Sequence, residues 1–221
     1  LIIEDNKELR EYLLAELEPY FNCFEATDGE AGLEMAIDIM PDLILSDIMM
    51  PGKSGIELCR ELKDNIITSH IPVILLTAKS NIEDQIIGFE SGADAYIPKP
   101  FNIEKLIANA NSLLKNRQLL REKLSGSITT LGQTKVKSDH DKFLNLIDST
   151  INDHLSDLQF GVEELSGIIG ISRTHLHRKM KAIAGQGPNA YIRRIRLQKA
   201  AELLLEGELS ITEVSMETGF N

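Results

Sequence analysis

The chain has 221 residues, of which 43% are hydrophobic and 26% are charged, a composition typical of globular proteins and a length that allows two ordinary domains. No apolar stretch approaches the roughly 20 residues of a membrane-spanning helix, so we expect this part of the protein to work in the cytoplasm. The two cysteines have no metal-site spacing and predict no disulfide framework.

The net charge of −11 is divided unevenly along the chain. Residues 1–116 contain 9 Lys and Arg against 21 Asp and Glu, a net charge of −12, and the remainder has a net charge of +1. Between residues 171 and 200 there are eight basic residues and no acidic one. The pattern predicts an acidic module joined to a module with a basic face.

Residues 1–118 alternate between short runs rich in Ile, Leu and Val, which have the length of buried strands, and amphipathic stretches of helix length. The expected strands lie near 1–3, 23–26, 43–46, 73–76 and 95–98. The expected helices lie near 7–18, 29–39, after the 50–52 turn to about 64, near 82–91, and from 102 onward. Short connections favour right-handed crossovers, so we predict an α/β fold with a five-stranded, doubly wound parallel sheet of the flavodoxin-like type.

Reactive polar residues follow four of the expected strands. They are Glu4, Asp5, Asp47, Thr77 and Lys99. In parallel sheets ligands bind just beyond the carboxyl ends of the strands. The spacing therefore predicts that three carboxylates, a hydroxyl and an ammonium gather at one edge of the sheet.

This set of side chains favours phosphoryl chemistry. Glu4, Asp5 and Asp47 would repel one another unless a cation joined them, and Mg²⁺ prefers such oxygen ligands together with phosphate oxygens. Thr77 and Lys99 are then free to contact the remaining phosphoryl oxygens. No His, Cys or activated Ser follows a strand, so transfer of a phosphoryl group onto a carboxylate fits better than hydrolysis.

The first half of the chain closely resembles the receiver domain of two-component response regulators. The matching segments are Glu4-Asp5, Asp47, Met49-Met50-Pro51-Gly52, Gly55, Thr77-Ala78, Gly92-Ala93-Asp94 and Lys99-Pro100-Phe101. The resemblance implies that Asp47 accepts a phosphoryl group from a histidine kinase. It also implies that Asp5, Asp47 and the carbonyl of Met49 bind Mg²⁺, with Glu4 acting through water.

The same resemblance assigns roles to the remaining pocket residues. Thr77 and Lys99 would bind the phosphoryl group, and Tyr96 would be the aromatic side chain that changes rotamer on activation. Lys99-Pro100 resembles the cis peptide of the family, which a proline makes accessible. Thr77, Tyr96 and Pro100 therefore form the expected switch.

The expected last helix of the receiver continues through Leu124 before Ser125 and Gly126 interrupt it. Residues 125–139 are rich in Ser, Thr, Gly and Lys and predict a linker. We therefore expect a receiver domain over 1–118, a helical extension and linker over 119–139, and an all-α domain over 140–221.

The second half contains an internal repeat. The segment 162–172 is matched position by position forty-nine residues later by 211–221. Each copy predicts a short helix, a turn through glycine, and a residue suited to N-cap a second helix, which is the pattern of a helix-turn-helix. In the helix after Ser172, an apolar face is expected at Leu176, Met180 and Ile183, and the opposite face carries Thr174, His177, Arg178 and Lys181.

Residues 143–221 resemble the AraC-type DNA-binding domain, in which one long helix joins two helix-turn-helix motifs. The segment from Gly187 to Leu197 matches the start of that helix. The resemblance implies that a DNA operator is bound by Arg173, Thr174, His177, Arg178 and Lys181 of the first motif and by Arg193 or Arg194 of the connecting helix. His175 and His177 lack further ligands nearby, which argues against a metal site.

The leading hypothesis is a phosphorylation-controlled transcription regulator that forms a homodimer. Because the sequence starts at Leu1 inside a strand and a long helix is expected to continue through residues 116–121, we expect a fragment of a hybrid sensor kinase, the cytoplasmic portion of an inner-membrane protein. This fragment stops before a second reading helix. The alternative is a phosphorelay or protein-interaction module whose helical half binds protein. A haloacid-dehalogenase-like phosphatase would need a second Asp at the position of Met49.

Overall fold

The computed structural model of the protein describes residues 1–78, 91–126 and 139–220. The chain divides into two compact units, residues 1–118 and 119–221, which we call the N-terminal unit and the helical unit. The helix expected near 82–91 and most of the linker expected at 125–139 lie outside the described residues. The two units are described separately below.

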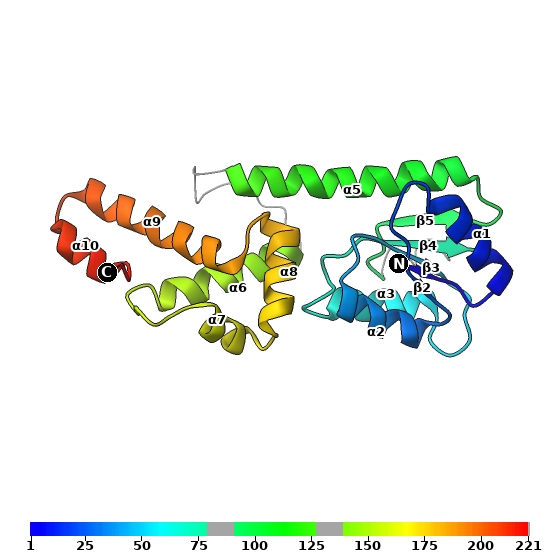
Figure 1. The fold of residues 1–221 in the computed structure, drawn as a ribbon, viewed down its shortest axis with the longest axis horizontal. Coiled ribbons are helices and arrows are strands. Elements are labelled where there is room, and N and C mark those ends of the chain that lie inside the picture. Colours follow the sequence, from blue (N-terminus) through cyan, green and yellow to red (C-terminus); the bar gives the residue numbers. More distant parts are fainter. Residues whose placement is uncertain (79–90, 127–138, 221) are drawn as a thin grey trace. The chain divides into compact units, whose positions relative to one another are not determined.

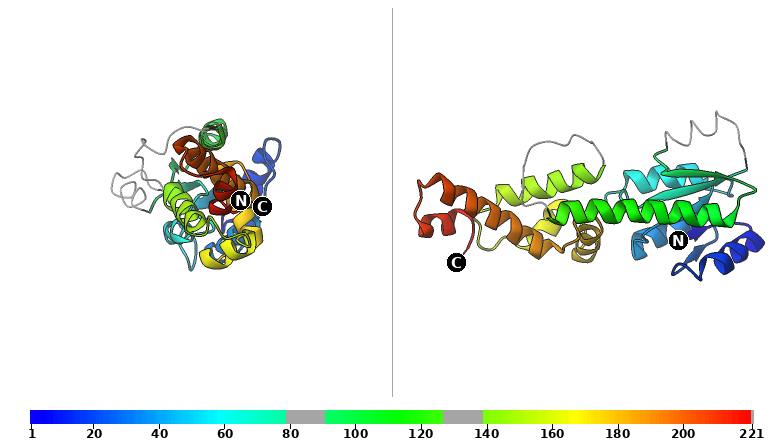
Figure 2. Two further views of the ribbon diagram at one scale, coloured as in Figure 1. Left: turned by 90° about the vertical axis from the view of Figure 1, so that its left-hand side faces the viewer. Right: turned by 90° about the horizontal axis from the view of Figure 1, so that it is seen from above.

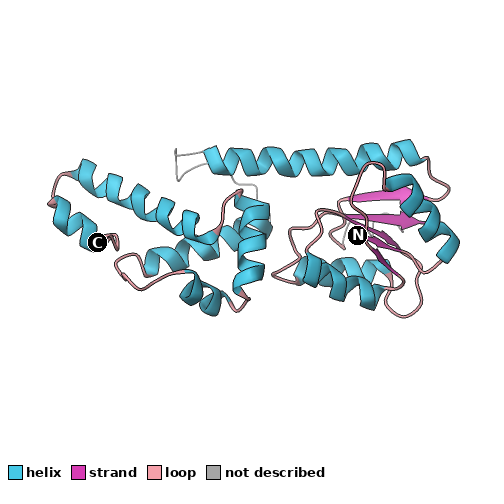
Figure 3. Cartoon of the chain, viewed as in Figure 1, coloured by secondary structure: helices cyan, strands magenta, loops and turns pink. Residues whose placement is uncertain are grey.

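The N-terminal unit is built on a parallel sheet of five strands in the order β2-β1-β3-β4-β5, which confirms the predicted fold class (Figure 3). The strands are β1 (Ile2–Ile3), β2 (Glu25–Ala26), β3 (Ile44–Asp47), β4 (Val73–Thr77) and β5 (Ala95–Pro98). Because the side chains of a strand alternate between the two faces of the sheet, a strand that is buried on both faces is apolar throughout. Four of the five residues of β4 are apolar for this reason, and the fifth, Thr77, is at its carboxyl end.

Among the described residues, two pairs of helices cover the two faces of this sheet (Figure 1). Helices α1 (Lys7–Leu17) and α5 (Ile103–Gly126) pack on the face to which Ile74 and Leu76 of β4 contribute. Helices α2 (Gly29–Ile39) and α3 (Gly55–Asp64) pack on the face of Val73 and Leu75. The two resulting cores hold β1, β3, β4 and β5 in place, so the carboxyl ends of these strands form one edge.

Side-chain caps fix where the helices beside that edge begin. The side chains of Asn6 and Asp28 accept hydrogen bonds from the backbone amides at the start of α1 and α2. A reciprocal capping box between Ser54 and Glu57 begins α3. These caps place the loops after β1 and β3 next to each other at the edge of the sheet.

The helical unit contains no strand among its described residues. Its helices are α6 (Asp139–Asp153), α7 (Val162–Ile169), α8 (Arg173–Ala184), α9 (Pro188–Glu206) and α10 (Ile211–Glu217). Figure 1 shows α7 and α8 joined by a short turn, and Figure 2 shows the long α9 and the short α10 that follows it from two further sides. Both predicted copies of the repeat start with a helix, α7 in the first and α10 in the second. Every helix among the described residues is too short or too polar to cross a lipid bilayer.

Candidate functional site

Three carboxylates meet at the carboxyl edge of the sheet. Glu4 and Asp5 follow β1, and Asp47 ends the adjacent strand β3. Carboxylate oxygens of the three residues lie within 4.8 Å of one another. Glu4 is 1% exposed and Asp47 is 6% exposed, whereas Asp5 is exposed. The structure thus brings together the three acids that the sequence places at strand ends.

Lys99, directly after β5, binds two of these carboxylates. Its Nζ lies 2.9 Å from Asp47 Oδ1 and 3.0 Å from Glu4 Oε2. Burial alone would lower the pKa of Lys99, but the hydrogen bonds to Asp47 and Glu4 outweigh it and raise the pKa above its ordinary value. The ammonium is therefore held charged between two buried acids.

Glu4 has the opposite electrostatic problem. Burial raises its pKa, the hydrogen bond from Lys99 opposes that shift, and the negative charge of Asp47 adds to it. One ammonium thus does not fully compensate this group of carboxylates. An additional cation at the three acids would relieve the strain on Glu4.

The donor set fits a hard divalent cation. All three side chains offer oxygen atoms, and Mg²⁺ takes oxygen ligands and keeps several waters. Asp5, which is exposed, leaves one side of the cluster open to water and to a phosphate group. Glu4, Asp5 and Asp47 are therefore suited to hold Mg²⁺.

The loop after β3 is held against Asp47 by Gly55, the first residue of α3. The amide of Gly55 donates a hydrogen bond to the carbonyl of Ile48 at 3.0 Å. A Cβ atom at Gly55 would collide with the carbonyl oxygen of Asp47 and would lie 2.9 Å from its carbonyl carbon. Only glycine fits this close approach, and the position of Asp47 depends on it. Met49 lies in the same loop with an exposed side chain.

The expected switch residues lie on the two strands beyond β3. Thr77 is buried at the end of β4, and its carbonyl accepts a hydrogen bond from the Lys99 amide at 2.7 Å. Tyr96 is half-buried on β5, and its hydroxyl lies 3.2 Å from Ser91 Oγ. Burial raises the pKa of Tyr96, and the hydrogen bond with Ser91 opposes the shift. The Lys99–Pro100 peptide bond is cis.

In the helical unit, α8 presents a polar face to solvent. Its apolar residues Leu176, Met180 and Ile183 are buried. The residues expected to contact DNA on this helix are all exposed: Arg173, Thr174, His177, Arg178 and Lys181. The side chain of Ser172 caps the helix by accepting a hydrogen bond from the His175 amide. This burial pattern follows the helical period.

One basic residue of α8 has a different environment. Lys179 is 1% exposed, and its Nζ lies 4.6 Å from the centre of the Phe143 ring of α6. An ammonium over an aromatic face is attracted by the ring quadrupole, so Lys179 packs α8 onto α6. Lys179 lies three residues after Leu176 and four before Ile183, so the helical period separates it from its exposed basic neighbours, but no local signal in the sequence identifies its aromatic partner.

The two arginines expected to contact the DNA backbone also differ. Arg193 of α9 is exposed, whereas Arg194 is half-buried with its guanidinium 4.4 Å from the centre of the Tyr191 ring. Tyr191 in turn donates a hydrogen bond to Asp148 Oδ1 of α6 at 2.8 Å. Tyr191 and Arg194 therefore connect α9 to α6, a function that the sequence analysis did not identify.

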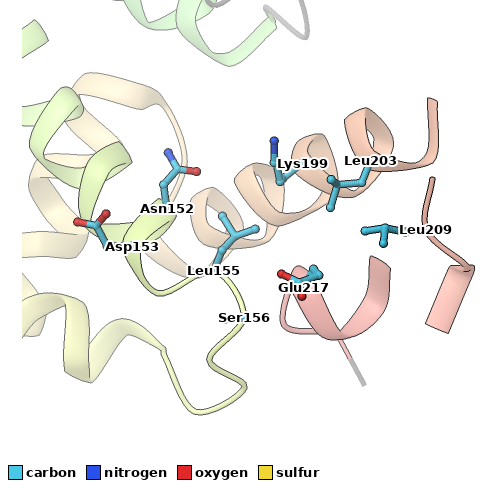
Figure 4. A pocket seen from close by; sticks show the side chains of 8 residues that line it. All are labelled: Asn152, Asp153, Leu155, Ser156, Lys199, Leu203, Leu209 and Glu217. Carbon is cyan, nitrogen blue, oxygen red and sulfur yellow. The ribbon is translucent and has the colours of Figure 1, made fainter. Parts of the chain in front are cut away.

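A surface pocket of about 390 Å³ lies between the end of α6, α9 and α10. Figure 4 shows the side chains that line it: Asn152, Asp153, Leu155, Ser156, Lys199, Leu203, Leu209 and Glu217. Lys199 forms an ion pair with Glu202 at 3.3 Å. The pocket leaves α6 and α10 incompletely packed against each other on this side.

A parallel α/β sheet whose carboxyl edge combines an acidic cluster with a paired lysine has the architecture of a receiver domain. A family model described as "Response regulator receiver domain" matches residues 1–111, and one described as "Helix-turn-helix domain" matches residues 165–221. The chain therefore belongs to the response regulator receiver family, and it carries a helix-turn-helix domain in its second half.

Curated proteins and solved structures are similar to this chain over all or part of its length. "Histidine kinase P4" of Formosa agariphila is 38% identical over all 221 residues of this chain, which span 16% of that relative. "Phosphate regulon transcriptional regulatory protein PhoB" of Pseudomonas aeruginosa is 43% identical over 52% of this chain and 51% of its own length. A solved response regulator receiver domain protein of Clostridium thermocellum is 27% identical, with a TM-score of 0.50 over 54% of this chain and 95% of that one. The chain thus spans about half or less of the curated relatives described here.

Proposed function

We propose that the chain is a phosphorylation-controlled transcription regulator in which Asp47 is the phosphoacceptor. The observation that carries the proposal is the contact of Lys99 with Asp47 and Glu4, beside Asp5, in a pocket at the carboxyl edge of the sheet. Such a pocket can hold a phosphoryl group by its charge, and no His or Cys follows a strand among the described residues of this edge. The protein is therefore proposed to act as a switch.

In the proposed reaction, an oxygen of the Asp47 carboxylate attacks the phosphorus of a phosphohistidine on a histidine kinase. The new P–O bond forms as the P–N bond breaks, and the leaving imidazole takes up a proton from water. Bound Mg²⁺, held by Glu4, Asp5, Asp47 and the carbonyl of Met49, would supply positive charge to the phosphoryl oxygens. Lys99 would exchange a carboxylate oxygen for a phosphoryl oxygen.

The phosphoryl group adds about −1.5 to −2 charge to a pocket that is already acidic. Besides the cation, the residues proposed to stabilise it are Thr77, through its hydroxyl, and Lys99. We propose that Thr77 moves toward the phosphoryl group. Tyr96 would then turn inward and lose its hydrogen bond with Ser91. The Lys99–Pro100 segment would fix the direction of the lysine. These movements would change the outer surface beside β5.

We propose that the output is sequence-specific DNA binding by an AraC-type domain. The exposed polar face of α8 supports this proposal, because its basic side chains and its threonine can donate hydrogen bonds to acceptors on base edges and phosphates. Arg173, Thr174, His177 and Arg178 would read bases, and Lys181 would neutralise a phosphate. Arg193 and Arg194 remain proposed backbone contacts, although Arg194 would have to leave the Tyr191 ring to reach one.

We further propose that the parent protein is a hybrid histidine kinase, because a relative named as a histidine kinase matches the chain over its whole length. In that case the phosphodonor is part of the same protein, and the present residues lie in the cytoplasm. The proposed domains are the receiver over 1–118, an extension and linker over 119–139, and the DNA-binding domain over 140–221. A homodimer is the expected active form, and sedimentation before and after phosphorylation tests it.

Labelling with a small phosphodonor such as acetyl phosphate tests the receiver assignment. The unsubstituted 221-residue chain should incorporate one phosphoryl group in a Mg²⁺-dependent way, and Asp47→Asn should incorporate none. Asp64→Asn is the matched control, because Asp64 is an exposed carboxylate of the same unit at the end of α3. Undiminished labelling of Asp47→Asn rules out the proposed acceptor.

DNA binding is tested separately on selected duplexes. Binding should weaken with salt, and Arg178→Ala should reduce the preference for the selected sequence over a scrambled one. If no DNA is bound at any salt concentration, the helical unit acts by another route, and the proposal of a protein-interaction or phosphorelay module replaces that of a transcription regulator.

A further inference from the structure

The side chain of Arg196 on α9 connects two segments that are distant in the sequence. Its Nη1 donates a hydrogen bond to the carbonyl of Gly219 at 3.1 Å. Its Nη2 donates to the carbonyl of Asp157 at 2.6 Å and lies 3.4 Å from that of Phe160. Asp157 and Phe160 lie between α6 and α7, and Gly219 is in the turn after α10. One guanidinium thus bridges the turn of the second copy of the repeat and the segment that leads into the first copy.

The turn glycines of the two copies have different surroundings. Both adopt the left-handed conformation, with φ of +77° at Gly170 and +66° at Gly219. A Cβ atom at Gly170 would meet no atom within 4 Å. At Gly219 it would lie 2.5 Å from the Leu155 carbonyl oxygen and 2.9 Å from Arg196 Cζ. The second turn is therefore packed against the loop after α6, and the first is open.

A surface pocket lies beside the contact between the Gly219 turn and the loop after α6. The pocket of Figure 4 separates Asn152 and Asp153 of α6 from Glu217 of α10. On that side the pocket limits contact between α6 and α10, and the charge-assisted hydrogen bonds of Arg196 link the turn after α10 to the segment between α6 and α7. A charged donor to several backbone carbonyls is also rigid, since the guanidinium is planar.

We propose that Arg196 is a positioning residue that fixes the second helix-turn-helix turn against the segment that leads into the first motif. This inference rests on the proposed DNA-binding function of the helical unit. By the repeat, Asn221 corresponds to Ser172, which caps the base-reading helix α8. The location of the Gly219 turn therefore sets where a second reading element starts relative to α8. Arg196 acts through backbone carbonyls and makes no contact with phosphates.

Hydrogen exchange in the Arg196→Gln variant of the 221-residue chain tests the bridge without DNA. The amides of Thr218 and Phe220, which donate to carbonyls of Val214 and Ser215, should exchange about tenfold faster, as expected for losing charge-assisted hydrogen bonds. The Leu176 amide of α8 should exchange at its original rate. Arg196→Lys should give an intermediate effect. Unchanged protection at Phe220 in Arg196→Gln would overturn the inference.

Two further variants separate the bridge from a general loss of stability. Gly219→Ala keeps Arg196 in the chain but should disturb the same amides, because the new methyl group would lie 2.5 Å from the Leu155 carbonyl oxygen and 2.9 Å from Arg196 Cζ. Gly170→Ala introduces the same left-handed strain in the open turn and should leave Phe220 unaffected. Equal effects of the two alanines on Phe220 would show that strain, and not the bridge, controls the second turn.

Salt dependence of binding to a mixed-sequence DNA duplex distinguishes positioning from a phosphate contact. Arg193→Gln removes an equal charge from an exposed site on the same helix and should reduce the salt slope by about 0.9 without changing hydrogen exchange. Arg196→Gln should weaken binding at an unchanged slope. A reduced slope with normal exchange in Arg196→Gln would make it a phosphate ligand. If the unsubstituted 221-residue chain binds no DNA, the proposed function fails. The hydrogen exchange of Arg196→Gln still decides whether the bridge exists.

Discussion

Replacing Gly55 by alanine should disturb the phosphoacceptor site and destabilise the N-terminal unit. The added methyl carbon would lie 2.9 Å from the carbonyl carbon of Asp47 and 3.0 Å from the Cα of Ile48. Carbon atoms in contact normally stay about 3.5–4.0 Å apart, so the backbone must open by at least about 0.5 Å. Overpacking of this kind costs about 2–3 kcal/mol when the neighbours are backbone atoms that cannot rotate away. Removal of a helical glycine returns about 0.5–1 kcal/mol, which leaves a net loss of about 1–2.5 kcal/mol.

Urea unfolding followed by hydrogen exchange at the Ile44 amide, which donates to the Pro72 carbonyl, measures this loss in the N-terminal unit. The labelling rate with acetyl phosphate should fall as well, because Asp47 is displaced. Gly52→Ala is the control: Gly52 has φ of +74° but no atom within 4 Å of a Cβ position, so it should lose about 1 kcal/mol without a change in labelling. Parental stability and parental labelling in Gly55→Ala would refute the reasoning.

Three more changes have defined outcomes. Lys99→Met should lower the free energy of unfolding by about 3 kcal/mol without divalent cations, since it leaves two buried carboxylates unpaired, and by less with Mg²⁺. An equal loss in urea titrations with and without Mg²⁺ would contradict this. Because pairing raises the pKa of Lys99, its stabilisation is complete below the ordinary value of 10.5 and should disappear in urea titrations as the pH rises through the higher folded-state pKa. Gly167→Ala, inside α7 with no atom within 4 Å of the new carbon, should raise the free energy of unfolding of the helical unit by about 0.5–1 kcal/mol, and a lower urea midpoint would count against it. Burial and then the charge of Asp148 raise the pKa of Tyr191, so its hydroxyl should stay protonated at pH 10.0. The phenolate absorbance at that pH should therefore be the same in Tyr191→Phe as in the unsubstituted chain. A lower absorbance in the variant would show that the hydroxyl is not held as described.

The sheet and the gathering of its polar edge could be predicted because both depend on local patterns. Runs such as 73–76 have the length and composition of buried strands, and parallel connections force their carboxyl ends to one side. The contact of Lys99 with Asp47 and Glu4 was less accessible. It depends on the distance between β5 and β1 across the intervening strands, which no local pattern encodes. Likewise, Gly55 matches the family pattern, but its collision with Asp47 is visible only in three dimensions.

In the helical unit the helical period correctly predicted which face of α8 is buried, as Leu176 and Met180 show. The period does not show which aromatic ring a buried or half-buried basic residue contacts. Lys179 is buried because Phe143 of α6 faces it, and Arg194 covers Tyr191. A basic residue therefore cannot be assigned to solvent or DNA from its sequence position alone, since the partner that removes it from solvent is distant in the chain. The proposed DNA contacts of Arg193 and Arg194 stay predictions.

The position of Lys99 also bears on how reversible the switch can be. The ammonium already has two anionic partners, Asp47 and Glu4, before any phosphoryl group arrives. Phosphorylation is then an exchange of one ion-pair partner for another, and the free-energy difference between the two states is the small difference of two similar attractions. A two-state equilibrium with a gap of a few kcal/mol can be shifted by a single bound group and can return when that group leaves. A lysine that was unpaired at rest would bind the phosphoryl group more strongly, and the activated state would be slower to reset.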